Sequence, residues 1–210
     1  MTMTLDRSHT IETLDELETL LGPVAESSLR KESPTLPPHY RAMIQASPFA
    51  LLATSGPDGL DASPRGDPAG FVQVHDERTL LMPERRGNNR ADSLRNILTD
   101  PRVALLFLIP GVGETLRVNG RATISVDPVL LERFRMQGQL PKCVLVIDVD
   151  TVFFQCARAI ARSNLWRPVA ADAKRPVPTP GAMLEALTQA AIDGAAYDRD
   201  LPERQRATLY

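Results

Sequence analysis

The spacing of hydrophobic residues changes near residue 49, which separates a helical start from a strand-rich middle. The first stripe at helical spacing comprises Ile11, Leu14, Leu17, Leu20 and Leu21. Gly22 and Pro23 end this predicted helix. A second short helix is predicted between Pro38 and Ser47. We expect both helices to cover a sheet or a partner subunit.

Short apolar or alternating runs from residue 49 onward predict strands. These runs are residues 49–54, 60–67, 70–74, 79–82, 103–109, 115–124, 144–149 and 152–156. Residues 103–109 are continuously apolar, which predicts a strand buried on both faces. Asp127-Pro128 is a helix-start signal. Several short strands joined by hairpins, with helices inserted, predict an α+β fold built on an antiparallel barrel.

The segment from Pro83 to Pro101 is the strongest functional signal in the chain. Arg85, Arg86 and Arg90 surround Gly87-Asn88-Asn89 where a strand ends and a helix begins. The first turn of a helix leaves N–H groups unpaired and its dipole favours an anion there. Guanidinium groups bind phosphate oxygens bidentately, so the loop is a candidate phosphate site.

A structural interpretation of the same loop stays open. Arginine-rich turns before helices are often solvated, and Asn88 or Asn89 would then be only an N-cap, with Asp92 completing a capping box. Asp92 also competes with an anion for the helix start. The helix that follows has an expected apolar stripe of Ala91, Leu94, Ile97 and Leu98.

Two further segments carry candidate chemistry. In Ser63-Pro64-Arg65-Gly66-Asp67, the proline cannot donate to a sheet and the glycine permits close approach of a flat ring. The local pattern by itself favours the alternative, an edge-strand bulge with a solvated Arg65. Arg117 and Arg121 alternate on one strand face, either in a cleft or exposed to solvent. Arg158, Ser163 and Trp166 follow the last strand, and the tryptophan either stacks on a planar cofactor or anchors the packing.

Composition and charge exclude several classes of protein. The 210 residues carry a net charge of -2, which gives no general attraction to nucleic acid or to an anionic membrane. No apolar run is long enough to span a membrane and no signal peptide is expected at the start. Cys143 and Cys156 are predicted to be buried free thiols in a reducing cytoplasm. The three histidines have no ligand-spaced partner, so no metal site is predicted, and no hydrolase or dinucleotide fingerprint occurs.

Three regions are predicted along the chain. Residues 1–46 form an N-terminal helical segment, residues 47–168 form the main domain, and residues 169–210 form a proline-rich linker with a C-terminal helix. That closing helix is expected over residues 183–191, followed by a polar tail, and it must dock on this subunit or on another.

Taken in order, the segments at residues 47–59, 61–72, 85–101, 106–111, 114–122 and 161–166 resemble the pyridoxamine 5'-phosphate oxidase-like flavoproteins. The similarity is greatest to a bacterial subgroup of FMN-dependent proteins and covers about residues 47–168. The resemblance implies a six-stranded antiparallel split β-barrel. It also implies a homodimer that binds FMN in two clefts at the subunit interface.

The resemblance assigns FMN contacts to particular positions. Its phosphate-binding loop falls on Asn88, Asn89 and Arg90, and its ring-lining strand falls on Ser63, Pro64, Arg65 and Gly66. Pro83 and Glu84 match a ring-lining pair, while Arg158, Ser163 and Trp166 match the subgroup's pattern. The R-x-V-L-L-K strand and the C-terminal Arg-Leu-x-Pro signature of vitamin B6 oxidases are missing, which argues against oxidation of pyridoxamine phosphate.

The sequence therefore predicts an FMN-dependent oxidoreductase that acts on an unidentified small substrate. No catalytic acid or base is assigned, and Arg65 and Arg117 are the candidates for binding an anionic substrate. Two alternatives remain: a non-catalytic flavin- or haem-binding sensor, carrier or store, and a barrel that holds the deazaflavin F420.

Overall fold

The computed structural model describes residues 5–170 and 172–210. Residues 1–4 of the expected N-terminal segment and residue 171 of the expected linker lie outside the described residues. The chain divides into two compact units, with the boundary between Glu32 and Ser33.

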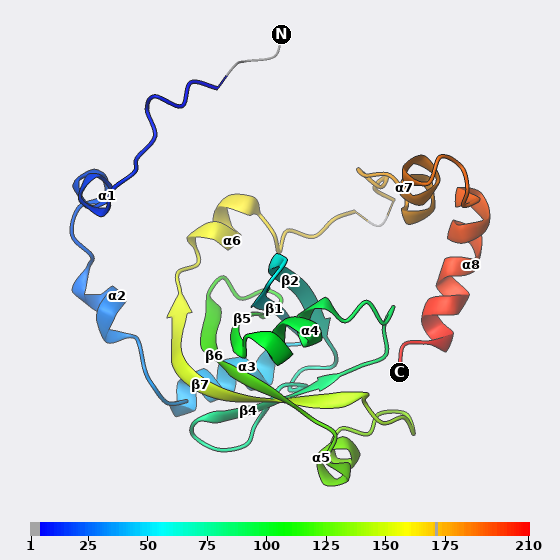
Figure 1. Cartoon of the computed structure of the whole chain (residues 1–210), viewed down its shortest axis with the longest axis horizontal. Coiled ribbons are helices and arrows are strands. Elements are labelled where there is room, and N and C mark those ends of the chain that lie inside the picture. The colour runs from blue at the N-terminus through cyan, green and yellow to red at the C-terminus, as the bar shows by residue number, and fades with distance from the viewer. Residues whose placement is uncertain (1–4, 171) are drawn as a thin grey trace. The chain divides into compact units, whose positions relative to one another are not determined.

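The first unit contains α1 (Leu14–Leu21) and α2 (Glu26–Arg30) (Figure 1). A capping box between Thr13 and Glu16 starts α1, and Gly22, with φ of 73°, ends it as predicted. No residue of α1 is buried. The first unit therefore does not bury the apolar stripe of α1.

The second unit is built on an antiparallel sheet of seven strands in the order β2-β1-β5-β6-β7-β4-β3. The strands are β1 (Phe49–Gly56), β2 (Gly59–Gly66), β3 (Gln73–Val74), β4 (Thr79–Glu84), β5 (Arg102–Leu108), β6 (Thr115–Ser125) and β7 (Cys143–Gln155). The mixed α+β class with an antiparallel sheet is confirmed. The sheet has seven strands, one more than the six that the family resemblance implies, and it is not closed. The strand expected over residues 70–74 is reduced to the two residues of β3.

Two strand predictions are corrected by the sheet. The two strands expected in residues 144–156 are one long curved strand, β7, whose two ends pair with different parts of β6 (Figure 1). The strand expected to be buried on both faces, β5, buries Val103, Leu105 and Phe107 and leaves the residues between them partly exposed. A continuously apolar strand sequence does not show whether one face of the strand is buried or both faces are.

The helices of the second unit lie before, between and after the strands. They are α3 (Pro38–Ala46), α4 (Asp92–Thr99), α5 (Pro128–Arg133), α6 (Arg158–Ser163), α7 (Pro180–Leu187) and α8 (Gly194–Ala207). The Asp127 side chain accepts from the Val129 N–H at the start of α5, as its sequence predicts. In contrast, α8 replaces an expected polar tail. Asp193 caps α8, and Pro202, a residue that normally interrupts helices, lies within it.

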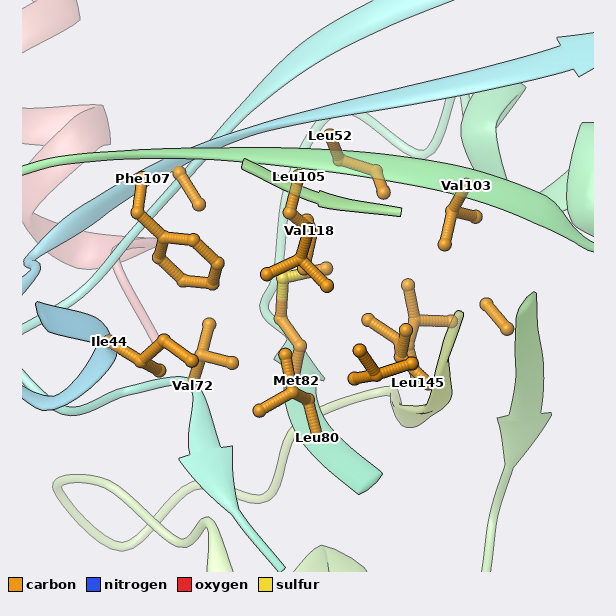
Figure 2. Close-up of a cluster of buried hydrophobic side chains, with 14 of the residues drawn as sticks. Ile44, Leu52, Val72, Leu80, Met82, Val103, Leu105, Phe107, Val118 and Leu145 are labelled. Carbon is orange, nitrogen blue, oxygen red and sulfur yellow. The ribbon is translucent and has the colours of Figure 1, made fainter. Parts of the chain in front are cut away.

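The main core lies between the two halves of the curved sheet. Figure 2 shows Leu105 and Phe107 of β5 pointing toward Val72 and Met82, and all four belong to one buried cluster. A register shift interrupts β6 at Gly120, where an added Cβ would lie 2.3 Å from the carbonyl oxygen of Asp148. A glycine is required there because the backbone of β7 approaches so closely.

The two cysteines differ in their surroundings. Both thiols are free, but Cys143 is buried and Cys156 is exposed just after β7, so the prediction that both are buried is wrong for Cys156. Within the described residues, no helix has the length and apolarity needed to cross a membrane.

Candidate functional site

A cavity of about 770 Å³ lies where β2, the end of β4 and the loop before α4 meet. Its lining comprises Asp61, Ser63, Pro64, Arg65, Gly66, Asp67, Phe71, Pro83, Glu84, Arg85, Arg86, Gly87, Asn88, Arg90, Ala91, Asp92, Ser93, Leu209 and Tyr210. Its volume is within the range of small-molecule sites. Segments that are far apart in the sequence therefore form one concave site.

The cavity gathers most, but not all, of the residues that the sequence nominates. Ser63 to Gly66, Pro83, Glu84, Asn88 and Arg90 line it, whereas Asn89, Arg158, Ser163 and Trp166 do not. The Trp166 indole donates to the Val112 carbonyl oxygen at 2.7 Å, and the Ser163 hydroxyl donates to the Ile160 carbonyl oxygen at 3.1 Å. Within one subunit, Trp166 therefore anchors α6 to the β5–β6 loop.

The start of α4 lies at one end of the cavity. Ala91, with φ of 57°, is the N-cap residue, and no side chain caps the helix. The Asn88 side chain instead accepts from the Arg90 N–H at 3.0 Å, so the predicted asparagine N-cap is wrong. The Arg90 guanidinium is bonded to Asp92. The first-turn amides of α4 consequently have no side-chain partner and remain available for an anion.

Six of the eight charged side chains that line the cavity form ion pairs, and Asp61 and Arg86 do not. Arg65 Nε lies 2.9 Å from Glu84 Oε2. Arg85 Nε lies 2.7 Å from Asp67 Oδ2 and its Nη1 donates to the Phe134 carbonyl oxygen at 2.6 Å. Among the described residues, Arg86 alone of the cavity's arginines has no ion-pair partner. Arg86 is thus the arginine of the cavity that is open to an anionic ligand, while the Asp61 carboxylate is bonded by the Ser93 hydroxyl.

Asp61 and Ser93 form a polar network that the sequence did not reveal. Ser93 Oγ donates to Asp61 Oδ2 at 2.6 Å and lies 2.7 Å from Ser63 Oγ. Arg65 Nη1 donates to the same Ser63 oxygen at 2.9 Å. The network ties the first turn of α4 to β2 and holds the Arg65 guanidinium in the cavity.

The predicted apolar stripe of α4 is correct for Leu94 and Ile97, which pack in or against the core, and wrong for Ala91 and Leu98. Ser93 and Ile97 are its buried residues, while Ala91 is exposed and Leu98 is 78% exposed. A serine is buried here because its hydroxyl finds partners in β2. The spacing of Ser93 and Ile97, four residues apart, is the only signal of this arrangement in the sequence.

Tyr210 is a second feature that sequence reasoning missed. Its hydroxyl donates to Asp67 Oδ1 at 2.7 Å, and the Arg85 guanidinium carbon lies 5.5 Å from the centre of its ring. The hydrogen bond to Asp67, followed by burial, raises the pKa of the Tyr210 phenol. The segment after α8 therefore closes one side of the cavity.

Two further candidate groups are not placed to react in this cavity. Burial, followed by the Glu84 carboxylate opposite it in the sheet, raises the pKa of the Cys143 thiol to about 11. That thiol stays protonated near neutral pH and is a poor nucleophile. Arg117 lies 5.6 Å from the centre of the Phe153 ring and outside the cavity. Of the two arginines expected to bind an anionic substrate, only Arg65 lines this site.

The family model described as Pyridoxamine 5'-phosphate oxidase matches residues 36–156, more than half of the chain. The chain belongs to this family. Its fold is a split barrel, and the open antiparallel sheet of the second unit carries the cavity within the matched residues, apart from Leu209 and Tyr210. The family resemblance that the sequence motifs indicate is therefore confirmed.

Solved structures of similar shape include three bacterial proteins. HupZ of Group A Streptococcus is 19% identical over 55% of this chain and 90% of its own, with a TM-score of 0.45. A pyridoxamine 5'-phosphate oxidase-like protein of Lactobacillus delbrueckii is 21% identical over 58% and 95%, with a TM-score of 0.45. General Stress Protein 26 of Bacillus anthracis is 20% identical over 54% and 88%, with a TM-score of 0.42. No curated protein matches the chain.

Proposed function

We propose that the cavity binds FMN and that the protein is an FMN-dependent oxidoreductase acting on a small substrate. The observation that carries this proposal is the convergence of Ser63 to Gly66, Pro83, Glu84, Asn88 and Arg90 on one cavity at the start of α4. These are the positions to which the family resemblance assigns contacts with the flavin ring and with its phosphate.

The chemistry of the lining fits a flavin mononucleotide. The uncapped first turn of α4 and the unpaired Arg86 suit the phosphate. Pro64, Gly66 and Pro83 line the cavity with little side-chain bulk, which would leave room for the ring. The Arg65–Glu84 pair places charge beside that surface without adding net charge.

The bound flavin would supply electron transfer, and the chain would supply position and electrostatics. In this scheme Arg86 and the α4 amides hold the phosphate. Ser93 and Asp61 fix Ser63 and, through it, the guanidinium of Arg65. No side chain of this chain is assigned as a proton donor or acceptor.

A homodimer completes the proposal. Arg158, Ser163 and Trp166 match the subgroup's flavin-site pattern, yet they lie outside the cavity of their own subunit. We propose that they reach the FMN bound mainly by the partner subunit. Light scattering on the purified protein is expected to give twice the 23.1 kDa mass of the chain. A monomer that binds FMN fully would contradict this arrangement.

Substitution of Arg90, in the loop before α4, provides the direct test of the phosphate site. Arg90→Ala removes a cation and frees Asp92, whose carboxylate then repels the phosphate at the helix start. FMN affinity, measured by quenching of flavin fluorescence, is expected to fall about tenfold or more. Arg199→Ala is the matched control, because Arg199 is exposed and pairs with Asp200 outside the cavity. Equal FMN affinity in the two variants would remove Arg90 from the site.

A non-catalytic flavin-, F420- or haem-binding protein is the second candidate. It is favoured by one observation: each carboxylate of the cavity is bonded to a neighbouring arginine or hydroxyl, so none is free to transfer a proton. The visible spectrum of the protein distinguishes FMN, deazaflavin and haem. Anaerobic addition of NADH or NADPH then separates the two functions, because bleaching of bound FMN supports an oxidoreductase and an unchanged spectrum supports a binder.

A further inference from the structure

A second cavity adjoins the candidate cofactor site. It has a volume of about 940 Å³ and shares Arg86, Gly87, Asn88 and Leu209 with the first cavity. The rest of its lining comes from the last part of α8 and the residue that follows it, including Arg204, Arg206 and Thr208. The loop that would hold the cofactor phosphate is therefore also one wall of a second site.

The charge of this second cavity is one-sided. Three arginines line it, Arg86, Arg204 and Arg206, and none of its lining residues is acidic. Within the described part of the chain, no carboxylate forms an ion pair with these three residues. Arg204 lies 4.4 Å from the centre of the Tyr197 ring, which orients its guanidinium but leaves its charge uncompensated.

The contrast with the first cavity is informative. There, three arginines are each neutralised by a carboxylate, which suits a ligand that is mostly uncharged and carries one anionic group. The second cavity has three positive charges in a protein whose net charge is -2. Guanidinium groups bind phosphate oxygens bidentately, and a cluster of them favours a ligand with several negative oxygens.

We propose that Arg86, Arg204 and Arg206 form a second anion site that binds a pyrophosphate-like group next to the phosphate of the bound cofactor. The position of this site beside a cofactor phosphate rests on the proposed function. Two sources could supply this group: a dinucleotide flavin, whose pyrophosphate would place one phosphate in each cavity, and a separate phosphorylated substrate. Because Arg86 lines both cavities, its guanidinium would contact the anions in both sites.

Calorimetric titration of the full chain with inorganic pyrophosphate at low ionic strength tests the site itself. Arg206→Gln is expected to weaken pyrophosphate binding about three- to tenfold, since exposed cations are partly screened by water and salt. Arg199→Gln is the control, because it removes a charge from the same helix at a position that lines neither cavity. No pyrophosphate binding, or equal binding by both variants, would overturn the proposal.

Titrations with FMN and FAD identify the source of the anion and separate this proposal from the proposed function. Tighter binding of FAD than of FMN, with that preference lost in Arg206→Gln, supports a dinucleotide flavin. Binding of pyrophosphate to the FMN-loaded protein supports a separate phosphorylated substrate. If FMN and FAD do not bind but pyrophosphate binding still depends on Arg206, the flavin proposal fails and the anion site stands.

Discussion

Asp67→Ala is expected to lower the free energy of unfolding by about 3–5 kcal/mol. The Asp67 side chain is 2% exposed and bonds the Arg85 guanidinium, which is 17% exposed, at 2.7 Å. Removal of the carboxylate leaves Arg85 buried with its charge uncompensated, and that penalty exceeds the loss of the bond itself. The same substitution removes the acceptor of the Tyr210 hydroxyl. Urea denaturation followed by circular dichroism measures the change.

Tyr210→Phe is the matched control for Asp67→Ala. It keeps the ring beside Arg85 and removes only the hydroxyl, so the expected loss is smaller, about 1 kcal/mol. Folding raises the pKa of the phenol above its ordinary value of 10.0. The hydrogen bond therefore makes its full contribution to the free energy of unfolding below pH 10.0, and that contribution is lost as the pH rises through the pKa of the folded state. Similar losses in the two variants would show that the Asp67–Arg85 pair is not the principal contact.

The second large effect is expected at Ile97, in the helix that starts at the candidate phosphate site. Ile97 is 4% exposed in the main core, whereas the adjacent Leu98 is 78% exposed. Ile97→Ala is expected to cost about 2–5 kcal/mol of unfolding free energy through lost burial and a cavity. Leu98→Ala is expected to change it by no more than about 0.5 kcal/mol. Both values come from urea denaturation under the same conditions.

The comparison of these two variants tests where α4 faces. Equal losses would mean that Leu98 is buried in the protein in solution, as the predicted apolar stripe requires. A large loss for Ile97→Ala alone supports the arrangement in which Ser93 and Ile97 face β2 and the core. Only that orientation lets Ser93 hold Ser63 and Asp61 beneath the cavity.

The position of the cavity within the family fold has a consequence for ligand choice. Part of its lining comes from β2 and β4, which belong to the matched family region, whereas Leu209 and Tyr210 come from beyond it. The segment after α8 therefore adds a wall that the family match does not include. Differences in ligand between this protein and other members of the family are expected to arise at that wall.

The sequence by itself determined the features that depend on near neighbours. The turn between β1 and β2, the Asp127 N-cap of α5 and the arginine- and asparagine-rich loop before α4 all follow from residues a few positions apart. Local backbone preferences and local hydrogen bonds suffice to specify them. For the same reason the sequence located much of the loop and strand that line the candidate site.

Only the tertiary structure decided which charges remain available to a ligand. Asp67 reaches Arg85 across 18 positions, Asp61 reaches Ser93 across 32, and Asp67 reaches Tyr210 across 143. No local pattern encodes such pairs, because they form when the sheet brings β2, β4 and α4 together and the segment after α8 docks beside them. The pairing neutralises Arg65, Arg85 and Arg90 and leaves Arg86 as the unpaired cation of the cavity.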